Sequence, residues 1–153
     1  AKSVGVSYVM VGHSERRDLF NENLEMIKKK IKKAKENNLK VILCVGETLA
    51  ERENGQTIDV IKEQLSILED ENIIISYEPV WAIGNNKTPT NFEIKEVVNF
   101  IKKCYNVKVL YGGSVSEENI ANLNEVKQID GFLIGGASMD PDRLIKILEV
   151  TSK

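Results

Sequence analysis

Short runs of apolar and β-branched residues alternate with longer amphipathic segments along the whole chain of 153 residues. The short runs predict five strands, at residues 8–11, 41–45, 73–77, 107–111 and 131–134. Between them, apolar positions recur every three or four residues, which predicts helices at residues 23–37, 56–69, 91–103, 117–122 and 140–149. Asn91, Ser116 and Asp140 stand where the last three helices should begin, and each can cap the free N–H groups of a first turn.

The predicted strands are apolar throughout rather than alternating, which is typical of strands covered on both faces. Strand–helix alternation of this kind indicates an α/β fold with a parallel sheet, either open and doubly wound or closed as a barrel. The pattern does not choose between these two architectures. No linker or shift of composition divides the chain, so residues 1–153 are expected to form a single domain.

The charge and cysteine content of the chain limit which binding partners and which cell compartment are expected. Lys and Arg total 21 against 23 Asp and Glu, and the net charge of -2 gives no electrostatic footprint for nucleic acid or an anionic membrane. The lysine-rich run at residues 28–35 lies opposite apolar positions of a helical pattern and is interpreted as a solvated face. Cys44 and Cys104 are interpreted as reduced thiols, and with no signal peptide or long apolar run a cytoplasmic protein is expected.

Polar and glycine-rich residues follow every predicted strand, at the edge where parallel α/β folds place their active sites. In chain order the segments are GHSERR at 12–17, CVGE at 44–47, YEPVWAIG at 77–84, YGGSV at 111–115 and GFLIGGAS at 131–138. His13, the one histidine, and Glu78 form a plausible acid–base pair for proton transfer next to a carbonyl. The two Gly-Gly turns offer backbone N–H groups to an anion such as phosphate. Taken singly, a lone histidine is more often a structural residue, and a Gly-Gly turn is more often only a turn former.

Together these five segments resemble successive signatures of the triosephosphate isomerase family, in that family's order and over the whole chain. The resemblance implies an incomplete TIM (β/α)₈ barrel, of which this chain carries strands four to eight, about five parallel strands alternating with helices, without the first three. It also implies a glycolytic and gluconeogenic isomerase that interconverts dihydroxyacetone phosphate and glyceraldehyde 3-phosphate, with no metal and no organic cofactor.

The resemblance also assigns roles to residues. Glu78 would move the proton between the two substrate carbons, and His13 would polarise the carbonyl oxygens as an uncharged imidazole. Residues 79–88 would form a lid over the substrate. The backbone N–H groups that hold the phosphate would be those of Gly84, Ser114, Gly135 and Gly136. Trp81 would belong to the hinge of the lid, and Tyr111 would latch it.

The chain departs from the family pattern in two places. No segment matches the Asn and Lys that the family carries at the end of its first strand, so Glu15, which resembles the partner of that Lys, is expected to face water or a new partner. The family dimer, built largely from the third loop, is not expected either. In the lid, Asn86 replaces the usual Gly, and Pro89 lacks the N–H that the latch tyrosine would bind.

Three hypotheses follow. The chain is an isomerase once an oligomer or a complementing segment restores the missing wall, or a non-catalytic, self-associating barrel fragment with at most weak phosphate binding, or another sugar-phosphate isomerase. The segment at 77–84 argues against the third. Because an open sheet has two raw edges, we expect a homo-oligomer that buries interior side chains such as Val9, Val11, Ile42 and Leu133. Apart from the triose phosphate substrate, neither nucleic acid nor membrane is expected as a partner.

Overall fold

A computed structural model describes residues 2–84 and 87–152. Its centre is one five-stranded parallel sheet in the order β1-β2-β3-β4-β5. The strands are β1 (Tyr8–Val11), β2 (Lys40–Val45), β3 (Ile74–Tyr77), β4 (Lys108–Tyr111) and β5 (Gly131–Phe132). All five predicted strands are therefore present, and the prediction of an α/β fold with parallel strands is confirmed.

Helices follow the strands as the amphipathic pattern predicted, with some shortening. The long ones are α2 (Leu24–Glu36), α4 (Thr57–Leu65), α5 (Asn91–Cys104) and α7 (Pro141–Thr151), and α6 (Ile120–Leu123) is a single turn. Two helices were not predicted, α1 (Ser14–Phe20) and α3 (Leu49–Glu53). Each is too short to show a repeated apolar face, which is why periodicity misses them. Three 3₁₀ turns complete the secondary structure, η1 (Lys2–Val4), η2 (Val80–Ala82) and η3 (Gly136–Met139).

The helix starts differ from two of the predicted caps. Thr90, not Asn91, caps α5, because its hydroxyl accepts the Glu93 N–H while the Glu93 carboxylate accepts the Thr90 N–H, a reciprocal capping box. Helix α6 begins only at Ile120, so Ser116 lies in the turn before it. The prediction for α7 is confirmed, since Asp140 accepts the N–H groups of the first turn.

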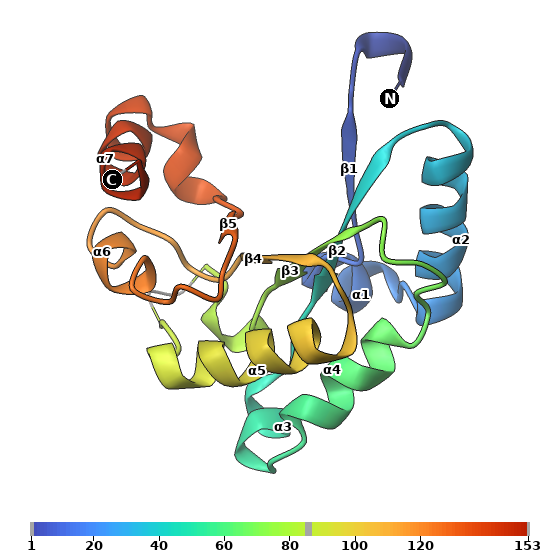
Figure 1. Ribbon diagram of the computed structural model, residues 1–153, viewed down its shortest axis with the longest axis horizontal. Coiled ribbons are helices and arrows are strands. Elements are labelled where there is room, and N and C mark those ends of the chain that lie inside the picture. Colours follow the sequence, from blue (N-terminus) through green and yellow to red (C-terminus); the bar gives the residue numbers. More distant parts are fainter. Residues whose placement is uncertain (1, 85–86, 153) are drawn as a thin grey trace.

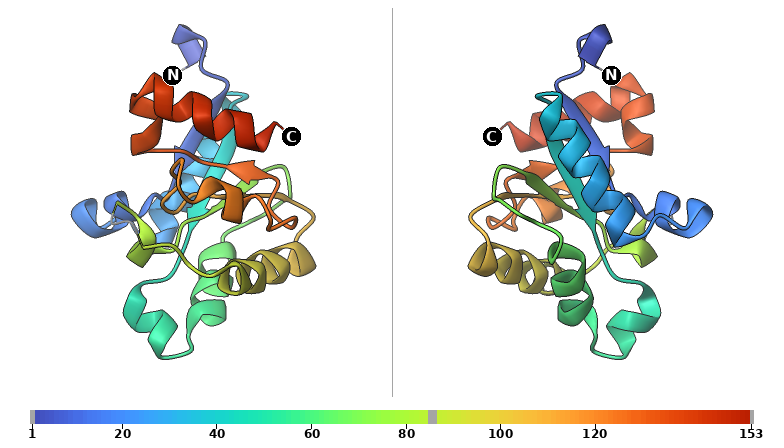
Figure 2. Two further views of the ribbon diagram at one scale, coloured as in Figure 1. Left: turned by 90° about the vertical axis from the view of Figure 1, so that its left-hand side faces the viewer. Right: turned by 90° about the vertical axis from the view of Figure 1, so that its right-hand side faces the viewer.

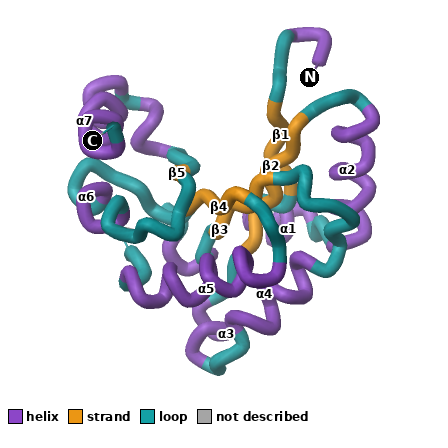
Figure 3. The backbone as a smooth tube through the Cα atoms, in the orientation of Figure 1, coloured by secondary structure: helices purple, strands orange, loops and turns teal. Residues whose placement is uncertain are grey.

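The arrangement in space matches part of a barrel rather than a doubly wound sheet. Each strand pairs with the next one along the chain, and the strand order never reverses. The helices α2, α4, α5, α6 and α7 form an arc around the outside of the sheet in chain order (Figure 1 and Figure 3). A doubly wound sheet would instead reverse its order and carry helices on both faces. Among the described residues β1 and β5 do not pair, so the barrel is incomplete.

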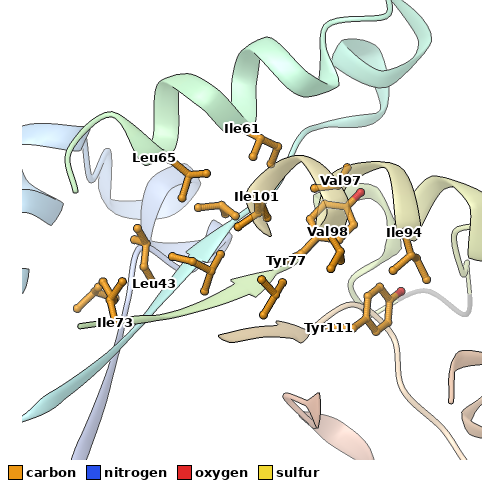
Figure 4. Packing of buried hydrophobic residues seen from close by; sticks show 14 of the residues in the cluster. Leu43, Ile61, Leu65, Ile73, Tyr77, Ile94, Val97, Val98, Ile101 and Tyr111 are labelled. Carbon is orange, nitrogen blue, oxygen red and sulfur yellow. The ribbon is translucent and has the colours of Figure 1, made fainter. Parts of the chain in front are cut away.

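The main core lies between the sheet and this outer arc of helices. Leu43, Ile75 and Tyr77 point from the strands toward the helices, and all are fully buried. Figure 4 shows Ile61, Leu65 and the apolar side chains of α5 packed over them. The rings of Tyr77 and Tyr111 meet edge to face with centroids 6.4 Å apart. Each such buried side chain stabilises the fold by about 1.5–3 kcal/mol, which fixes the strands whose ends carry the site.

The opposite face of the sheet is only partly covered. Side chains alternate along a strand, and on β1 the residues on this face are Tyr8 and Met10, which are 44% and 47% exposed. Val9 and Val11 were predicted to line this interior, and that prediction is wrong, because both belong to the helix-facing core. The prediction that the strands are covered on both faces also fails at β1.

Two segments extend away from the sheet. The N-terminal segment with η1 projects beyond the rest of the chain, and Val4 is 79% exposed (Figure 1 and Figure 2). Helix α1 projects sideways in Figure 2 and ends in two exposed apolar residues, Leu19 and Phe20. Across the described part of the chain, no helix combines the length and apolar character needed to span a membrane.

Candidate active site

Residues that follow β1, β3, β4 and β5, at the carboxyl ends of these strands, line a cleft of about 540 Å³. Side chains or backbone of seven predicted site residues line it, namely His13, Glu15, Glu78, Gly84, Ser114, Gly135 and Gly136. The parallel arrangement explains this, because residues that follow parallel strands meet at one edge of a sheet. Trp81 and Tyr111 are not among the lining residues, and their roles as lid hinge and lid latch stay predictions.

Glu78 follows β3 directly, and its backbone N–H donates to the Val45 carbonyl at 2.7 Å. Its side chain is 2% exposed, and Oε1 accepts a hydrogen bond from the Ser76 hydroxyl at 3.2 Å. Oε2 accepts none from any described residue and lies 3.7 Å from His13 Nε2. A buried carboxylate oxygen without a donor is uncommon in folded proteins. Oε2 is thus the Glu78 oxygen that lies nearest the His13 imidazole.

Burial raises the pKa of Glu78, because the ionised carboxylate loses its water. The Cys44 thiol, His13, Ser76 and the Arg17 guanidinium oppose the shift without cancelling it. The carboxylate is therefore more basic than an exposed glutamate. General-base chemistry benefits from this, since a base works best with a pKa near the working pH.

His13 stands at the junction between β1 and α1. Its backbone carbonyl accepts the Arg16 N–H, while its side chain takes no part in capping the helix. The imidazole is 24% exposed and is free to point into the cleft. Arg17 fixes this junction from behind, because its guanidinium donates to the carbonyls of Gly12 and Cys44, both at 2.8 Å. Arg17 was not among the predicted site residues.

Glu15 lies one residue into α1, at the rim of the cleft, and is exposed. It forms no ion pair with any residue in the described ranges. The expectation that this carboxylate faces water agrees with its exposed position at the rim. Its role as the partner of a strand-one Lys stays a prediction.

Glu47 forms a buried network beside the site and was also missed as a functional residue. Its side chain is fully buried, and Oε1 accepts from Arg52 Nε at 2.6 Å, Trp81 Nε1 at 3.0 Å and the Tyr77 hydroxyl at 3.2 Å. The backbone carbonyl of Glu47 accepts the Val80 N–H at 2.9 Å. The start of the predicted lid is thus tied to the end of β2 through both side chain and backbone.

The glycine-rich ends of β4 and β5 present backbone rather than side chains. Within the described residues, the N–H groups of Gly135 and Gly136 donate no hydrogen bond, and both glycines are exposed to the cleft. The N–H of Ser114 differs, because it donates to the Ala82 carbonyl at 2.9 Å. In this conformation Ser114 could hold an anion through its N–H only after that contact with the lid is broken.

The far end of the predicted lid is held by Asn119, which donates to the Thr88 hydroxyl at 3.1 Å. The Asn86 substitution at its tip lies outside the described residues. Tyr111, the predicted latch, is fully buried, and its hydroxyl has no hydrogen-bond partner among the described residues. Pro89 has no N–H to offer it. The role of Tyr111 as a latch therefore stays a prediction.

No group of three or more His, Cys, Asp or Glu side chains is placed to hold a metal ion within residues 2–84 and 87–152. The residues that could bind a ligand are instead the donors of the Gly-Gly turn and His13.

Of two further residues of the site, Ser76 could have been found from the sequence, whereas Cys44 could be placed only by the pairing of two strands. Ser76 lies two positions before Glu78, so both point to the same face of β3. Cys44 is in register with Ser76 on the neighbouring strand and therefore shares that face. Only the strand pairing was needed to place the three side chains together, and the chain pattern alone does not give it.

Comparison with known proteins agrees with this geometry. A family model described as triosephosphate isomerase matches residues 1–151. The chain is 45% identical to triosephosphate isomerase of Alkaliphilus metalliredigens, over 96% of this chain and 66% of that protein. It is 42% identical to that of Mycoplasmoides gallisepticum, over 97% of this chain and 66% of the relative. The chain is also 46% identical to triosephosphate isomerase of Coprinopsis cinerea, over 90% of this chain and 62% of that protein.

The alignments cover more of this chain than of its relatives. Nearly all of this chain is matched, whereas the chain spans 66% of the length of the first two relatives. Both the extent of the family match and the level of identity are high enough to settle ancestry. The chain belongs to the triosephosphate isomerase family.

Proposed function

We propose that the strand-end cleft is a triose phosphate isomerase site, which interconverts dihydroxyacetone phosphate and glyceraldehyde 3-phosphate. Glu78 removes a proton from the carbon beside the substrate carbonyl, and the electron pair of that C–H bond forms the carbon–carbon double bond of an enediolate. The same carboxyl group returns the proton to the neighbouring carbon, while the hydroxyl proton passes from one substrate oxygen to the other by way of the His13 imidazole, and the carbonyl re-forms on the oxygen that lost it. His13 donates a hydrogen bond to the substrate oxygens, on which negative charge develops.

One observation supports this proposal above the others. Glu78 Oε2 is buried, has no donor among the described residues and lies 3.7 Å from His13 Nε2 at the cleft. Glu22 and Glu47 each have one such oxygen as well, but of these three carboxylates only Glu78 lines the cleft, where a free lone pair can take a proton from a ligand. The free N–H groups of Gly135 and Gly136 stand in the same cleft and suit the phosphate of the substrate.

A coupled assay with glyceraldehyde 3-phosphate tests the proposal, with Glu78→Gln as the main variant. We expect turnover that falls by about 10²–10⁴-fold in the variant, the usual contribution of a positioned base. Glu69→Gln makes the same chemical change at an exposed carboxylate and should leave turnover unaltered. Turnover that is absent, or equal in Glu78→Gln and the unmodified chain, would count against an active site in these 153 residues.

The second candidate function is a non-catalytic barrel unit that self-associates, and it is favoured by the open edge of the sheet. Tyr8 and Met10 of β1 leave apolar surface exposed beside unpaired backbone, which invites pairing with a second copy. Sedimentation velocity at micromolar concentration should show a homo-oligomer. Tyr8→Glu adds a charge at this edge while keeping a partner for the nearby Lys40 amine, and should shift the protein toward monomer. A monomeric unmodified chain would contradict self-association.

The two candidates predict different results when a polypeptide carrying the first three strands of a family relative is added. Recovered turnover supports an isomerase that needs a complementing wall, and unchanged inactivity supports the barrel unit. We place the protein in the cytoplasm, where both cysteines, buried Cys44 and exposed Cys104, would stay as the free thiols that the structure contains.

A further inference from the structure

Arg143 is the one residue with a permanent positive charge among the described residues that line the cleft. It lies in the first turn of α7, directly after the η3 turn that begins at Gly136. The other lining residues at this end come from the loop after β4, including Ser114 and Ser116. Arg143 is therefore at the end of the cleft where the glycine turns gather, which makes it a candidate for contact with an anion.

The Arg143 guanidinium is held in one orientation but keeps hydrogen-bond donors that no described residue accepts. Its Nε donates to both carboxylate oxygens of Glu117, at 2.9 and 3.0 Å. No described residue takes a hydrogen bond from either terminal nitrogen, Nη1 or Nη2, and the side chain is 41% exposed. An arginine carries four N–H donors on these two nitrogens, arranged as a fork that fits the oxygens of a phosphate. Glu117 thus holds one edge of the group and leaves the phosphate-binding edge open.

The position of Arg143 in the first turn of α7 also favours a role in binding an anion. A cation in the first turn of a helix faces the positive end of the helix dipole, an arrangement that is unfavourable for stability. Asp140 and Asp142 are the residues that complement this dipole. A side chain that opposes a stability rule is expected where it serves function.

We infer that Arg143 is a cationic anchor for the phosphate group of the ligand, with Glu117 as the positioning residue that aims its guanidinium. The inference rests on the proposed function and deepens it. Nη1 and Nη2 donate to the phosphate oxygens, while the backbone N–H groups of Gly135 and Gly136 bind the same group from the turn. The shared chemistry is a phosphate dianion, either free or as a monoester.

Calorimetric titration with inorganic phosphate tests the anchor in the unmodified chain, Arg143→Gln, Arg143→Lys and Glu117→Gln. Arg143→Gln should weaken phosphate binding about tenfold or more, as loss of a charge-assisted pair does. Arg143→Lys should recover part of the affinity, because a point charge remains without the fork. Glu117→Gln keeps an acceptor for Nε but removes a negative charge, so affinity should rise by about two- to fivefold.

Opposite effects at the two partners separate an anchor from a structural ion pair. In a purely structural pair both variants would lower the melting temperature and leave phosphate affinity equal to that of the unmodified chain, and this result would overturn the inference. Dihydroxyacetone phosphate, titrated in the Glu78→Gln background to prevent turnover, identifies the source of the phosphate. Equal losses in Arg143→Gln for this ester and for free phosphate support the anchor, and a loss for neither overturns it.

The outcome is separable from that of the proposed function. If turnover depends on Glu78 but phosphate affinity does not depend on Arg143, the phosphate-anchor inference is overturned and the proposed isomerase function is still supported. Phosphate binding that depends on Arg143, without Glu78-dependent turnover, would support the anchor and count against the isomerase. A chain that binds no phosphate at all contradicts the anchor whatever its turnover.

Discussion

The ends of β2 and β3 hold their functional groups in a different way from the ends of β4 and β5. On the first side, Glu47 and Glu78 are buried carboxylates fixed by hydrogen bonds from neighbouring elements. On the second side, Gly135 and Gly136 offer exposed backbone, and the strand that leads to them has two residues. We call these the carboxylate side (strand ends of β2 and β3) and the glycine side (strand ends of β4 and β5).

In the proposed function, proton transfer belongs to the carboxylate side and phosphate recognition to the glycine side. A base needs a perturbed environment, and burial among packed side chains supplies it. A phosphate is bound well by exposed N–H groups and a cation, which need little burial. Substitutions on the carboxylate side should therefore destabilise the fold, while equivalent ones on the glycine side should be tolerated.

The largest expected effect is that of Glu47→Gln. The change removes the charge that partners Arg52, which is only 14% exposed, and it disturbs the acceptor of Tyr77 and Trp81. Breaking a buried pair costs about 3–5 kcal/mol. Urea unfolding of Glu47→Gln against Glu117→Gln measures the contrast, because the Glu117–Arg143 pair is partly open to solvent and should contribute about 0–1 kcal/mol. Equal losses would erase the difference between the two sides.

A pair of alanine substitutions compares the backbone of the two sides. A Cβ added at Gly46 would meet the Glu78 carbonyl oxygen at 1.8 Å, so the end of β2 or β3 must shift. Overpacking of this kind costs about 1–3 kcal/mol, occasionally more. A Cβ at Gly136 meets no heavy atom within 4 Å, and its φ is not positive. Gly136→Ala should leave the free energy of unfolding unchanged or raise it slightly. A Gly46→Ala protein as stable as the unmodified chain would contradict the close approach.

The pH dependence of stability reports on Glu78 itself. Its folded-state pKa is raised above the ordinary 4.5 by burial. As pH rises through 4.5, the unfolded chain releases this proton while the folded chain keeps it, so stability falls until the raised pKa is passed. The slope from one group reaches at most about 1.4 kcal/mol per pH unit. Glu78→Gln should remove this fall, measured by urea unfolding at several pH values. An unchanged slope would mean that Glu78 titrates normally.

The smallest expected effect is on the glycine side, at the cap of α7. Asp140 accepts the N–H groups of Asp142 and Arg143. Asp140→Ala should cost about 1 kcal/mol, as loss of a helix cap does. Hydrogen exchange should show faster amide exchange confined to the first turn of α7. Faster exchange that spreads to β2 and β3 would mean that the two sides are coupled.

Much of the fold could be predicted from the chain pattern, because buried parallel strands and amphipathic helices leave strong periodic signals. The strand ends also indicated the site, since His13, Glu78 and the Gly-Gly turns follow strands in order. The short helix α1 was missed because seven residues are too few for a repeat. Val9 and Val11 were assigned to the wrong face of the sheet, because a strand that is apolar throughout shows no alternation that would tell its two faces apart.

The supporting residues of the site could not be predicted from local pattern. Glu47 and Arg52 are five residues apart, yet their network depends on Tyr77 and Trp81 from the next strand end. Arg143 looked like an ordinary helix residue until the fold placed it in the cleft. Such contacts follow from strand register and crossover geometry, which the sequence of hydrophobic and polar positions does not specify.

The central claim is that Glu78 moves a proton on a triose phosphate. Its most direct measurement is deuterium incorporation into dihydroxyacetone phosphate in D₂O, followed by proton NMR. We expect incorporation at the carbon beside the carbonyl that exceeds a protein-free blank and disappears in Glu78→Gln. Incorporation at the blank rate, or at the same rate in Glu78→Gln as in the unmodified chain, would contradict it.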